Sequence, residues 1–499
     1  MSESTAILIT LVAYKLVLVG IGVAASRRTA SDADFFLGGR QLGAWVAALS
    51  ASASSSSAWT LLGVTGAAYA WGLAALWIVP ACVGGFALNW YVLAPRLRRH
   101  SAAEGSLTVT EVLAGATPQT WARAIRVVAS VIVLVSLLTY VAAQFQGAGK
   151  TFAETFSMSM SSAVLLGAGI VVAYTILGGF WAVSVTDTVQ GLVMATAAVA
   201  LPLGALAEVG GVGGLSDGLS AVQVDGYADW TRGMTGPAAF GFVLGLLGIG
   251  LGYPGQPHVA NRFMALRDAQ AVITGRRIAM GWALVMYLGM ITVGLCARVL
   301  LPELADKEVA FITVTRTVFP PGVAGVMIAA VLSAVMSTAD SQLLVAASAV
   351  AHDLGASGKN GRGVVARSRA VVLGLSLLAV GAALWGGQEI FSRVLFAWSA
   401  MGNAFGPLLL VLVIWGPVRP GARLASIVAG FSLSVAAYWH PDLSGTAWER
   451  VAPFIVAWLI CWFGRPSPSP SPSPSPSPEP EARSPKPRAA GQIPPPEST

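Results

Sequence analysis

Two hydroxyl side chains and a carboxylate stand close together in one apolar segment of this 499-residue chain. Within the segment, Ser337 and Thr338 are adjacent, and Asp340 lies three positions after Ser337. Adjacent hydroxyls in an apolar helix can bond back to carbonyls one turn earlier, which is a purely structural use. An intramembrane carboxylate is costly unless it faces a polar interior, so Asp340 weakens that explanation. Hydroxyls beside a negative charge suit a hard monovalent cation, which prefers oxygen ligands.

Two other apolar segments are interrupted by residues for which a simple membrane anchor has no use. Residues 47–59 contain a run of serines, and residues 245–257 contain glycines and prolines. Non-helical backbone is tolerated at membrane depth only where it is buried in protein or lines a polar cavity. Broken helices in corresponding places of two halves point to the binding site of a secondary transporter. The pattern therefore predicts a protein that moves a solute across a membrane.

Composition agrees with an integral membrane protein. The chain is 55% hydrophobic and 11% charged, whereas a soluble domain carries about 25% charged residues. Its net charge of +7 does not indicate nucleic acid, because the basic residues lie in short loops between apolar runs. No convergent nucleophile and base is recognisable, so we expect no enzyme activity. We also expect no cofactor and no metal other than a coupling ion.

The apolar runs predict about thirteen membrane-spanning helices, since a span needs about 20 apolar residues. The expected ranges are 6–26, 43–70, 73–94, 124–148, 159–179, 187–207, 236–256, 273–299, 322–351, 366–386, 391–416, 422–438 and 449–464. Lys and Arg concentrate in alternate loops, which places the N-terminus outside and the C-terminus in the cytoplasm. Residues 1–465 are expected to form the membrane domain. Residues 466–499 are rich in Ser and Pro and are expected to form a disordered cytoplasmic tail.

Several motifs in the same order resemble the sodium:solute symporter family, and within it the bacterial sodium/proline symporters. They are Phe36–Arg40, Gly178–Gln190, Gly252–His258, Met336–Thr338 and Asn403–Pro407, and the likeness runs from the first span to about residue 416. The resemblance implies the LeuT-type fold, an all-α architecture of two inverted five-helix repeats with flanking helices. It also implies a multi-pass protein of a bacterial-type plasma membrane. The partners implied are sodium, a small organic solute and the lipid bilayer.

The resemblance also assigns roles to individual residues. A sodium ion would be held by the carbonyls of Ala53, Ser56 and Ala334 and by the hydroxyls of Ser337 and Thr338. Asp187 would lie on the path of the cation, and Asp340 joins it there as the second acid. The solute pocket would comprise Ser55, Ser57, Tyr140, Ile249, Tyr253 and Pro257.

Two of these positions depart from the proline symporters that this chain resembles. Those proteins carry an aspartate at the position of Ser55 and a tryptophan at the position of Ile249. The first departure removes a negative charge near the cation, and the second removes an aromatic wall from the pocket. Sodium-coupled uptake of proline or another amino acid is the leading hypothesis. A proton-coupled carrier, a sodium symporter of another solute such as an organic acid, and a non-transporting nutrient sensor remain alternatives.

Overall fold

The computed structural model describes residues 2–26, 37–177, 180–350, 361–387 and 389–466. Within these residues the chain is almost entirely helical, and the one β pairing is an isolated bridge between Leu42 and Leu266. The helices of the first part are α1 (Glu3–Ser26), α3 (Ala44–Ser55), α4 (Val64–Trp71), α5 (Ile78–Ala87), α6 (Ala94–Glu104), α7 (Val109–Ala114), α8 (Gln119–Phe156), α9 (Met160–Leu177), α10 (Phe180–Glu208) and α11 (Gly211–Ser220). Those of the second part are α12 (Gly236–Leu247), α13 (Pro257–Met264), α14 (Ala269–Leu300), α15 (Ala310–Val318), α16 (Pro321–Ser348), α17 (Gly361–Trp385), α18 (Ile390–Trp415), α19 (Pro420–Trp439), α20 (Ala447–Arg450) and α21 (Ala452–Phe463). Short irregular helical turns connect some of them: η1 (Gly38–Arg40), η2 (Trp59–Gly63), η3 (Gly72–Trp77), η4 (Leu88–Leu93), η5 (Gly248–Gly255) and η6 (Lys307–Val309).

The expected all-α architecture is confirmed. Among the described residues, nine helical segments are long and apolar enough to cross a membrane, and two shorter apolar helices accompany them. Within the described residues, each of the thirteen expected ranges is mostly helical, but the number that crosses a bilayer stays a prediction. Met1–Arg465 form one compact unit. The expected tail, from residue 467 on, and the motif residues Phe36, Gly178 and Gly179 lie outside the described residues.

The first predicted break lies between α3 and η2. Ser56 leaves the helical region, with φ −109° and ψ 78°, and its N–H donates to the carbonyl of Ala53 at 3.1 Å. The Ser55 hydroxyl donates to the carbonyls of Ala51 and Ser52, at 2.9 and 3.0 Å. Serine side chains compete with the backbone for hydrogen bonds, which favours a helix end within a serine run. The helix therefore stops in the middle of the bundle and leaves carbonyls free for other partners.

The second predicted break lies between α12 and α13, where η5 contains Pro254. Proline has no N–H to donate, so a carbonyl upstream loses its helical partner. The Gln256 side chain adds hydrogen bonds at this break by donating to the carbonyl of Gly252 at 2.9 Å and to that of Trp398 at 3.0 Å. A Cβ added to Gly252 would lie 2.2 Å from the Trp398 ring. Glycine is therefore required here so that η5 can approach α18 closely.

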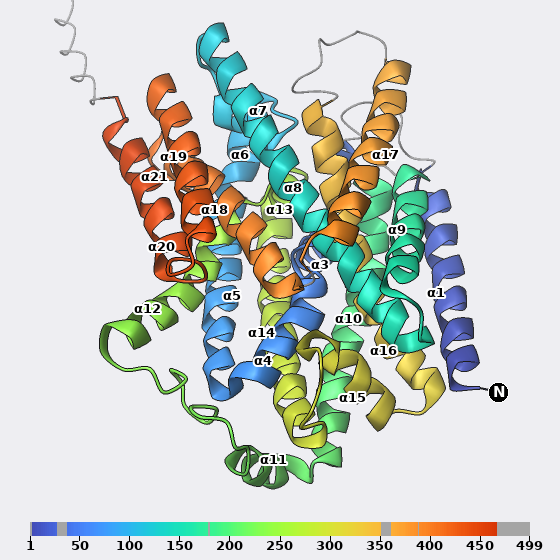
Figure 1. Ribbon diagram of the computed structural model, residues 1–499. Coiled ribbons are helices and arrows are strands. Elements are labelled where there is room, and N and C mark those ends of the chain that lie inside the picture. Colours follow the sequence, from blue (N-terminus) through green and yellow to red (C-terminus); the bar gives the residue numbers. More distant parts are fainter. Residues whose placement is uncertain (1, 27–36, 178–179, 351–360, 388, 467–499) are drawn as a thin grey trace, which may run out of the picture. The chain divides into compact units, whose positions relative to one another are not determined.

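The two broken helices are joined at the ends away from their breaks, and two further helices pack around them. Leu42 donates to the carbonyl of Ala265 at 3.0 Å, and Arg267 donates to the carbonyl of Leu42 at 3.1 Å. These bonds join the chain before α3 to the chain after α13. Helix α10 packs against α3, α14 and α16, and α16 packs against α3 and α8 (Figure 1). Polar side chains from α3, α10, α13 and α16 can thus meet away from water.

Candidate functional site

Helix α16 presents its paired hydroxyls to the carbonyl end of α3. Ser337 Oγ donates to the carbonyl of Ala53 at 3.2 Å and to that of Ala334 at 3.4 Å. Thr338 Oγ1 donates to the carbonyl of Ser54 at 3.1 Å. All of these residues are fully buried. Back-bonding within α16 is therefore not the only use of these hydroxyls, because both donate hydrogen bonds to carbonyls of the first broken helix.

All five residues that the sequence assigned to sodium share these contacts or border them. Ser56 donates its N–H to the Ala53 carbonyl, and its hydroxyl accepts from Trp282 Nε1 at 3.1 Å. Ser54, which the sequence reasoning missed, supplies the carbonyl that faces Thr338. The position of Ser54, directly after Ala53 in the serine run, is the sequence feature that could have identified it as a further ligand. The arrangement gathers carbonyl and hydroxyl oxygens, which are the ligands of a hard cation.

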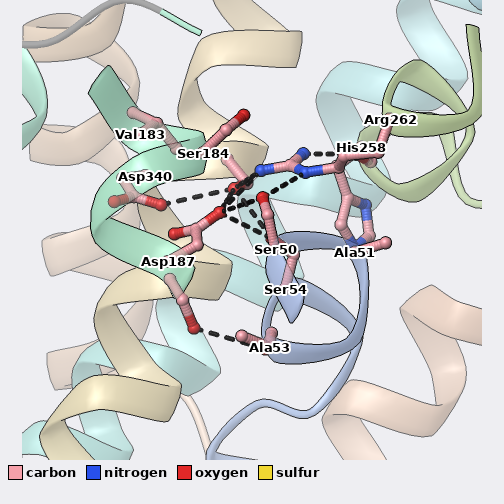
Figure 2. Close-up of polar contacts among 12 residues, drawn as sticks. Ser50, Ala51, Ala53, Ser54, Val183, Ser184, Asp187, His258, Arg262 and Asp340 are labelled. Atoms are coloured by element: carbon pink, nitrogen blue, oxygen red, sulfur yellow. Dashed lines mark hydrogen bonds and ion pairs between the residues drawn. The ribbon is translucent and has the colours of Figure 1, made fainter. Parts of the chain in front are cut away.

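One turn along α3 lies a buried charged cluster (Figure 2). Asp187 Oδ2 accepts from Ser50 Oγ at 2.8 Å, from Ser54 Oγ at 3.2 Å and from Arg262 Nη2 at 2.8 Å. Arg262 also donates to Ser50 through Nε at 2.9 Å. The exposed fractions of Arg262 and Asp187 are 1% and 0%. The ion pair thus joins α13 directly to α10, and the Ser50 and Ser54 hydroxyls of α3 donate to the same carboxylate.

The second acid, Asp340, borders this cluster. Its Oδ1 accepts from Ser341 Oγ at 3.4 Å, and Ser341 in turn accepts from Arg262 Nη2 at 2.5 Å. Asp187 Oδ1 and Asp340 Oδ2 are buried, and no hydrogen bond reaches them from the described residues. Two carboxyl groups therefore border one guanidinium in this buried cluster. An ionised carboxylate here would favour a cation.

The expectation that basic residues lie in loops is wrong for four of them, which are buried in helices: Lys150, Arg262, Arg423 and Arg450. Arg262 is buried in α13, and Lys150 of α8 has an exposed fraction of 6%. Lys150 Nζ pairs with Asp306 Oδ2 at 2.6 Å and with Glu308 Oε2 at 2.7 Å. No spacing rule in the sequence indicates the acidic partners of Arg262 and Lys150, which lie on other elements. Lys15, the charge in the first span, contacts the sulfur of Met336 on α16.

The residues assigned to the solute gather around an indole that the sequence did not single out. Tyr140 donates to Ser57 Oγ at 3.2 Å, and Trp398 Nε1 donates to the carbonyl of Ile249 at 3.1 Å. The ring centroid of Trp398 lies 4.7 Å from that of Tyr253 and 6.4 Å from that of Tyr140. Trp398 therefore contacts both the second break and Tyr140 of α8, and Tyr140 in turn contacts Ser57 at the first break.

Two members of the assigned solute set stand apart from these contacts. The Ser55 hydroxyl is committed to carbonyls of its own helix, and Pro257 is the first residue of α13. Gln144 was missed, although it follows Tyr140 by one turn on the same face of α8. Its Oε1 accepts from the N–H of Ala58 at 3.0 Å, while its buried Nε2 has no partner among the described residues. A buried unpaired donor beside the first break is suited to a solute acceptor.

The geometry has the elements of a coupled carrier: candidate cation ligands on α3 and α16, and polar and aromatic side chains beside both breaks. A family model described as the sodium:solute symporter family matches residues 35–430. The chain belongs to this family. The symporter is therefore a multi-pass membrane protein and a secondary transporter that couples solute uptake to sodium, as the sequence predicted.

Curated relatives of this chain include proline transporters. The sodium/proline symporter of Salmonella typhimurium is 34% identical over 445 residues, which cover 86% of this chain and 87% of the relative. The osmoregulated proline transporter of Bacillus subtilis is 35% identical over 436 residues, covering 86% and 87%. The high-affinity proline transporter of the same organism is 34% identical over 454 residues, covering 89% and 94%.

Solved structures support the fold. A sodium-coupled sialic acid symporter in a substrate-bound, outward-open state superposes with a TM-score of 0.76 at 18% identity, over 93% of this chain and 99% of that one. The inward-facing transporter Mhp1 gives a TM-score of 0.50 at 13% identity, over 84% and 90%. The LeuT-type fold predicted from the sequence is thereby confirmed.

Proposed function

We propose that this symporter takes up a small amino acid together with sodium by alternating access, and that L-proline is the leading candidate. The observation that carries the proposal is the meeting of the α16 hydroxyls with the carbonyls of Ala53 and Ser54, next to the contact between Ser57 and Tyr140. A cation bound to the first set would hold the broken helix in the form that presents Ser57. The names and the identity of the proline-transporting relatives support the choice of solute.

The sodium ion is assigned to Ala53, Ser56, Ala334, Ser337 and Thr338, with Ser54 as an added carbonyl. Asp187 and Asp340 supply negative charge on the cation path, and Arg262 offsets one of the two. The solute is assigned to Ser57, Tyr140, Ile249, Tyr253 and Pro257, to which Trp398 and Gln144 are added. The end of α3 and the start of α13 offer helix-terminal dipoles to the ammonium and the carboxylate of an amino acid.

Proton coupling is the second candidate function. It is favoured by the buried oxygens Asp187 Oδ1 and Asp340 Oδ2, which have no partner among the described residues. Counterflow of L-proline in proteoliposomes, with sodium and proton gradients imposed separately, distinguishes the two. Accumulation with a sodium gradient at equal pH supports our proposal. Accumulation with a proton gradient alone, or of a sugar or urea but no amino acid, contradicts it.

The membrane orientation proposed places Asp225 outside the cell and Glu104 in the cytoplasm. Cysteines introduced singly at these two positions, with Cys82, Cys296 and Cys461 replaced by alanine, are expected to react with an impermeant maleimide from opposite sides. Both are placed in loops or at a helix end, where a cysteine is tolerated. Labelling of both from one side would contradict the orientation.

We assign transport to residues 1–465 and give the Ser/Pro-rich tail no part in it. A chain truncated after Arg465 is expected to retain its uptake per molecule in the membrane, because the tail composition cannot bury a core. A large loss of that specific activity would overturn this division of the chain.

A further inference from the structure

One basic residue lies in the middle of a candidate membrane span that belongs to neither broken helix. Lys15 is part of α1, whose 24 residues include the apolar stretch Glu3–Ile21. At 1.5 Å per residue, Lys15 lies roughly 17 Å from either end of the helix, which is too far for its side chain to reach a headgroup region. An ammonium group at that depth is costly unless it has a partner inside the protein.

The lysine side chain meets α16, the helix that carries the paired hydroxyls. Helix α1 packs against α16, and Tyr14 Oη lies 2.5 Å from Ser333 Oγ. Lys15 Nζ contacts the sulfur of Met336, about one turn farther along α16. The next residue of α1, Leu16, is 68% exposed and marks the lipid-facing side of the helix. The ammonium group is therefore turned toward the bundle.

These contacts leave the ammonium group poorly satisfied. It has three donors, and a thioether is a weak acceptor. The ring of Tyr14 lies 5.3 Å from Lys15 Nζ and adds a cation–π contact. Among the described residues, no carboxylate lies within ion-pair distance of Lys15. Its charge therefore has to be balanced over a slightly longer distance.

Asp340 is the acid in position to balance it. Met336 and Asp340 are four positions apart on α16 and so lie on the same face, one turn from each other. Asp340 is fully buried, and its Oδ2 has no hydrogen-bond partner among the described residues. Lys15 lies within electrostatic reach of this carboxyl group across Met336. Opposite charges attract strongly at such a range where no water screens them.

The other buried base of the region is committed elsewhere. Arg262 pairs with Asp187 at 2.8 Å and reaches Asp340 only through the Ser341 hydroxyl. Once Lys15 is included, two carboxyl groups are matched by two basic groups. The cluster is then electrically balanced before any cation arrives.

The candidate sodium ligands lie close to this pair of charges. Ser337 and Thr338 precede Asp340 by three and two positions, and both donate to carbonyls of α3. A fixed positive charge beside Asp340 weakens the attraction of that acid for an ion held by these oxygens. Loss of the ammonium group should therefore strengthen sodium binding, and loss of the carboxylate should weaken it.

We propose that Lys15 is a built-in counter-cation of the sodium site, which balances Asp340 and thereby sets how tightly the site holds sodium. The lysine acts through Asp340 and touches neither the ion nor the solute, so it is a positioning residue. The inference rests on the proposed function, because it takes the coupling ion to be sodium held at the α16 hydroxyls.

The test measures the sodium concentration for half-maximal L-proline uptake into proteoliposomes at equal pH on both sides. Lys15→Met leaves Asp340 unbalanced and is expected to lower this concentration about tenfold, whereas Asp340→Asn leaves the ammonium group unbalanced and should raise it about tenfold. In the double variant the two shifts offset each other, so its value lies between those of the single variants. Lys15→Arg keeps the charge and should keep the wild-type value, and Leu16→Met is the matched control on the lipid-facing side.

Opposite shifts in the two single variants distinguish this role from a structural one, because loss of packing weakens sodium binding in both. Lys15→Gln, which keeps N–H donors, replaces Lys15→Met if the latter does not reach the membrane. Sodium-driven uptake by the wild type, with shifts in the same direction or with an unchanged sodium requirement after neutralisation of Lys15, overturns this inference alone. Proline uptake by the wild type that does not depend on sodium overturns the proposed function and this inference with it.

Discussion

The two broken helices are interrupted by opposite kinds of chemistry. In the first, serine hydroxyls end the helix, and the contacts to other helices run through oxygens, as between Ser337 and Ala53. In the second, proline and glycine end the helix, and the contact with α18 is a close approach of backbone at Gly252 and Gly402. The first break thus offers ligand oxygens, whereas the second is fixed by packing. Coupling of sodium binding to solute binding requires both breaks. A bound ion can reorganise only the first break, whose oxygens it contacts, while packing keeps the second in place.

Arg262 links the two breaks, and its removal should have the largest effect. Arg262→Ala leaves Asp187 buried without its ion-pair partner, which costs about 3–5 kcal/mol of unfolding free energy. Thermal unfolding of the purified protein in detergent measures this loss. The double variant Asp187→Asn with Arg262→Gln should regain much of the stability because no unpaired charge remains.

Arg267→Ala is the matched control for this experiment. The Arg267 and Asp268 side chains are 58% and 49% exposed, and a surface pair contributes about 0–1 kcal/mol. If Arg262→Ala unfolds at the same temperature as Arg267→Ala, the buried pair does not join the two breaks in the way described.

Packing at the second break should give the next largest effect. The Cβ of Gly252→Ala would meet Trp398, whose indole is held by the bond to the Ile249 carbonyl and cannot easily move. Overpacking of this kind costs about 1–3 kcal/mol, and uptake should fall with the melting temperature. Gly281→Ala, where nothing lies within 4 Å, should leave both unchanged or slightly raise the melting temperature. Equal behaviour of the two variants would contradict the close packing of η5 on α18.

The smallest effect is expected at Ile249, within the second break. Ile249→Trp supplies the aromatic wall of the related proline symporters and should strengthen proline binding by about 0.5–2 kcal/mol, a few-fold to about thirtyfold. Competition binding in saturating sodium measures it, with Ile249→Leu as a size-conserving control. Weaker proline binding by a well-folded Ile249→Trp protein would show that the pocket differs from the one proposed.

Sequence reasoning reached the breaks and the α16 hydroxyls because their signals are local. A serine run, Pro254 in a glycine-rich segment, and a Ser-Thr pair close to an acid each stand out within an apolar stretch. Arg262 was interpreted as a loop charge because a single basic residue near an apolar run is typical of a cytoplasmic boundary. Its partner Asp187 lies 75 positions away, and helical periodicity does not say which helices meet. Trp398 escaped notice for the same reason.

The sodium requirement of a Ser337→Ala and Thr338→Ala double variant tests the central claim most directly. Loss of two oxygen ligands should raise the sodium concentration for half-maximal proline uptake about tenfold or more, while the amount of protein in the membrane stays constant. Ser348→Ala, which removes a hydroxyl that bonds back to Val345 on the same helix, should leave that concentration unchanged. An unchanged sodium dependence in the well-expressed double variant would contradict the account.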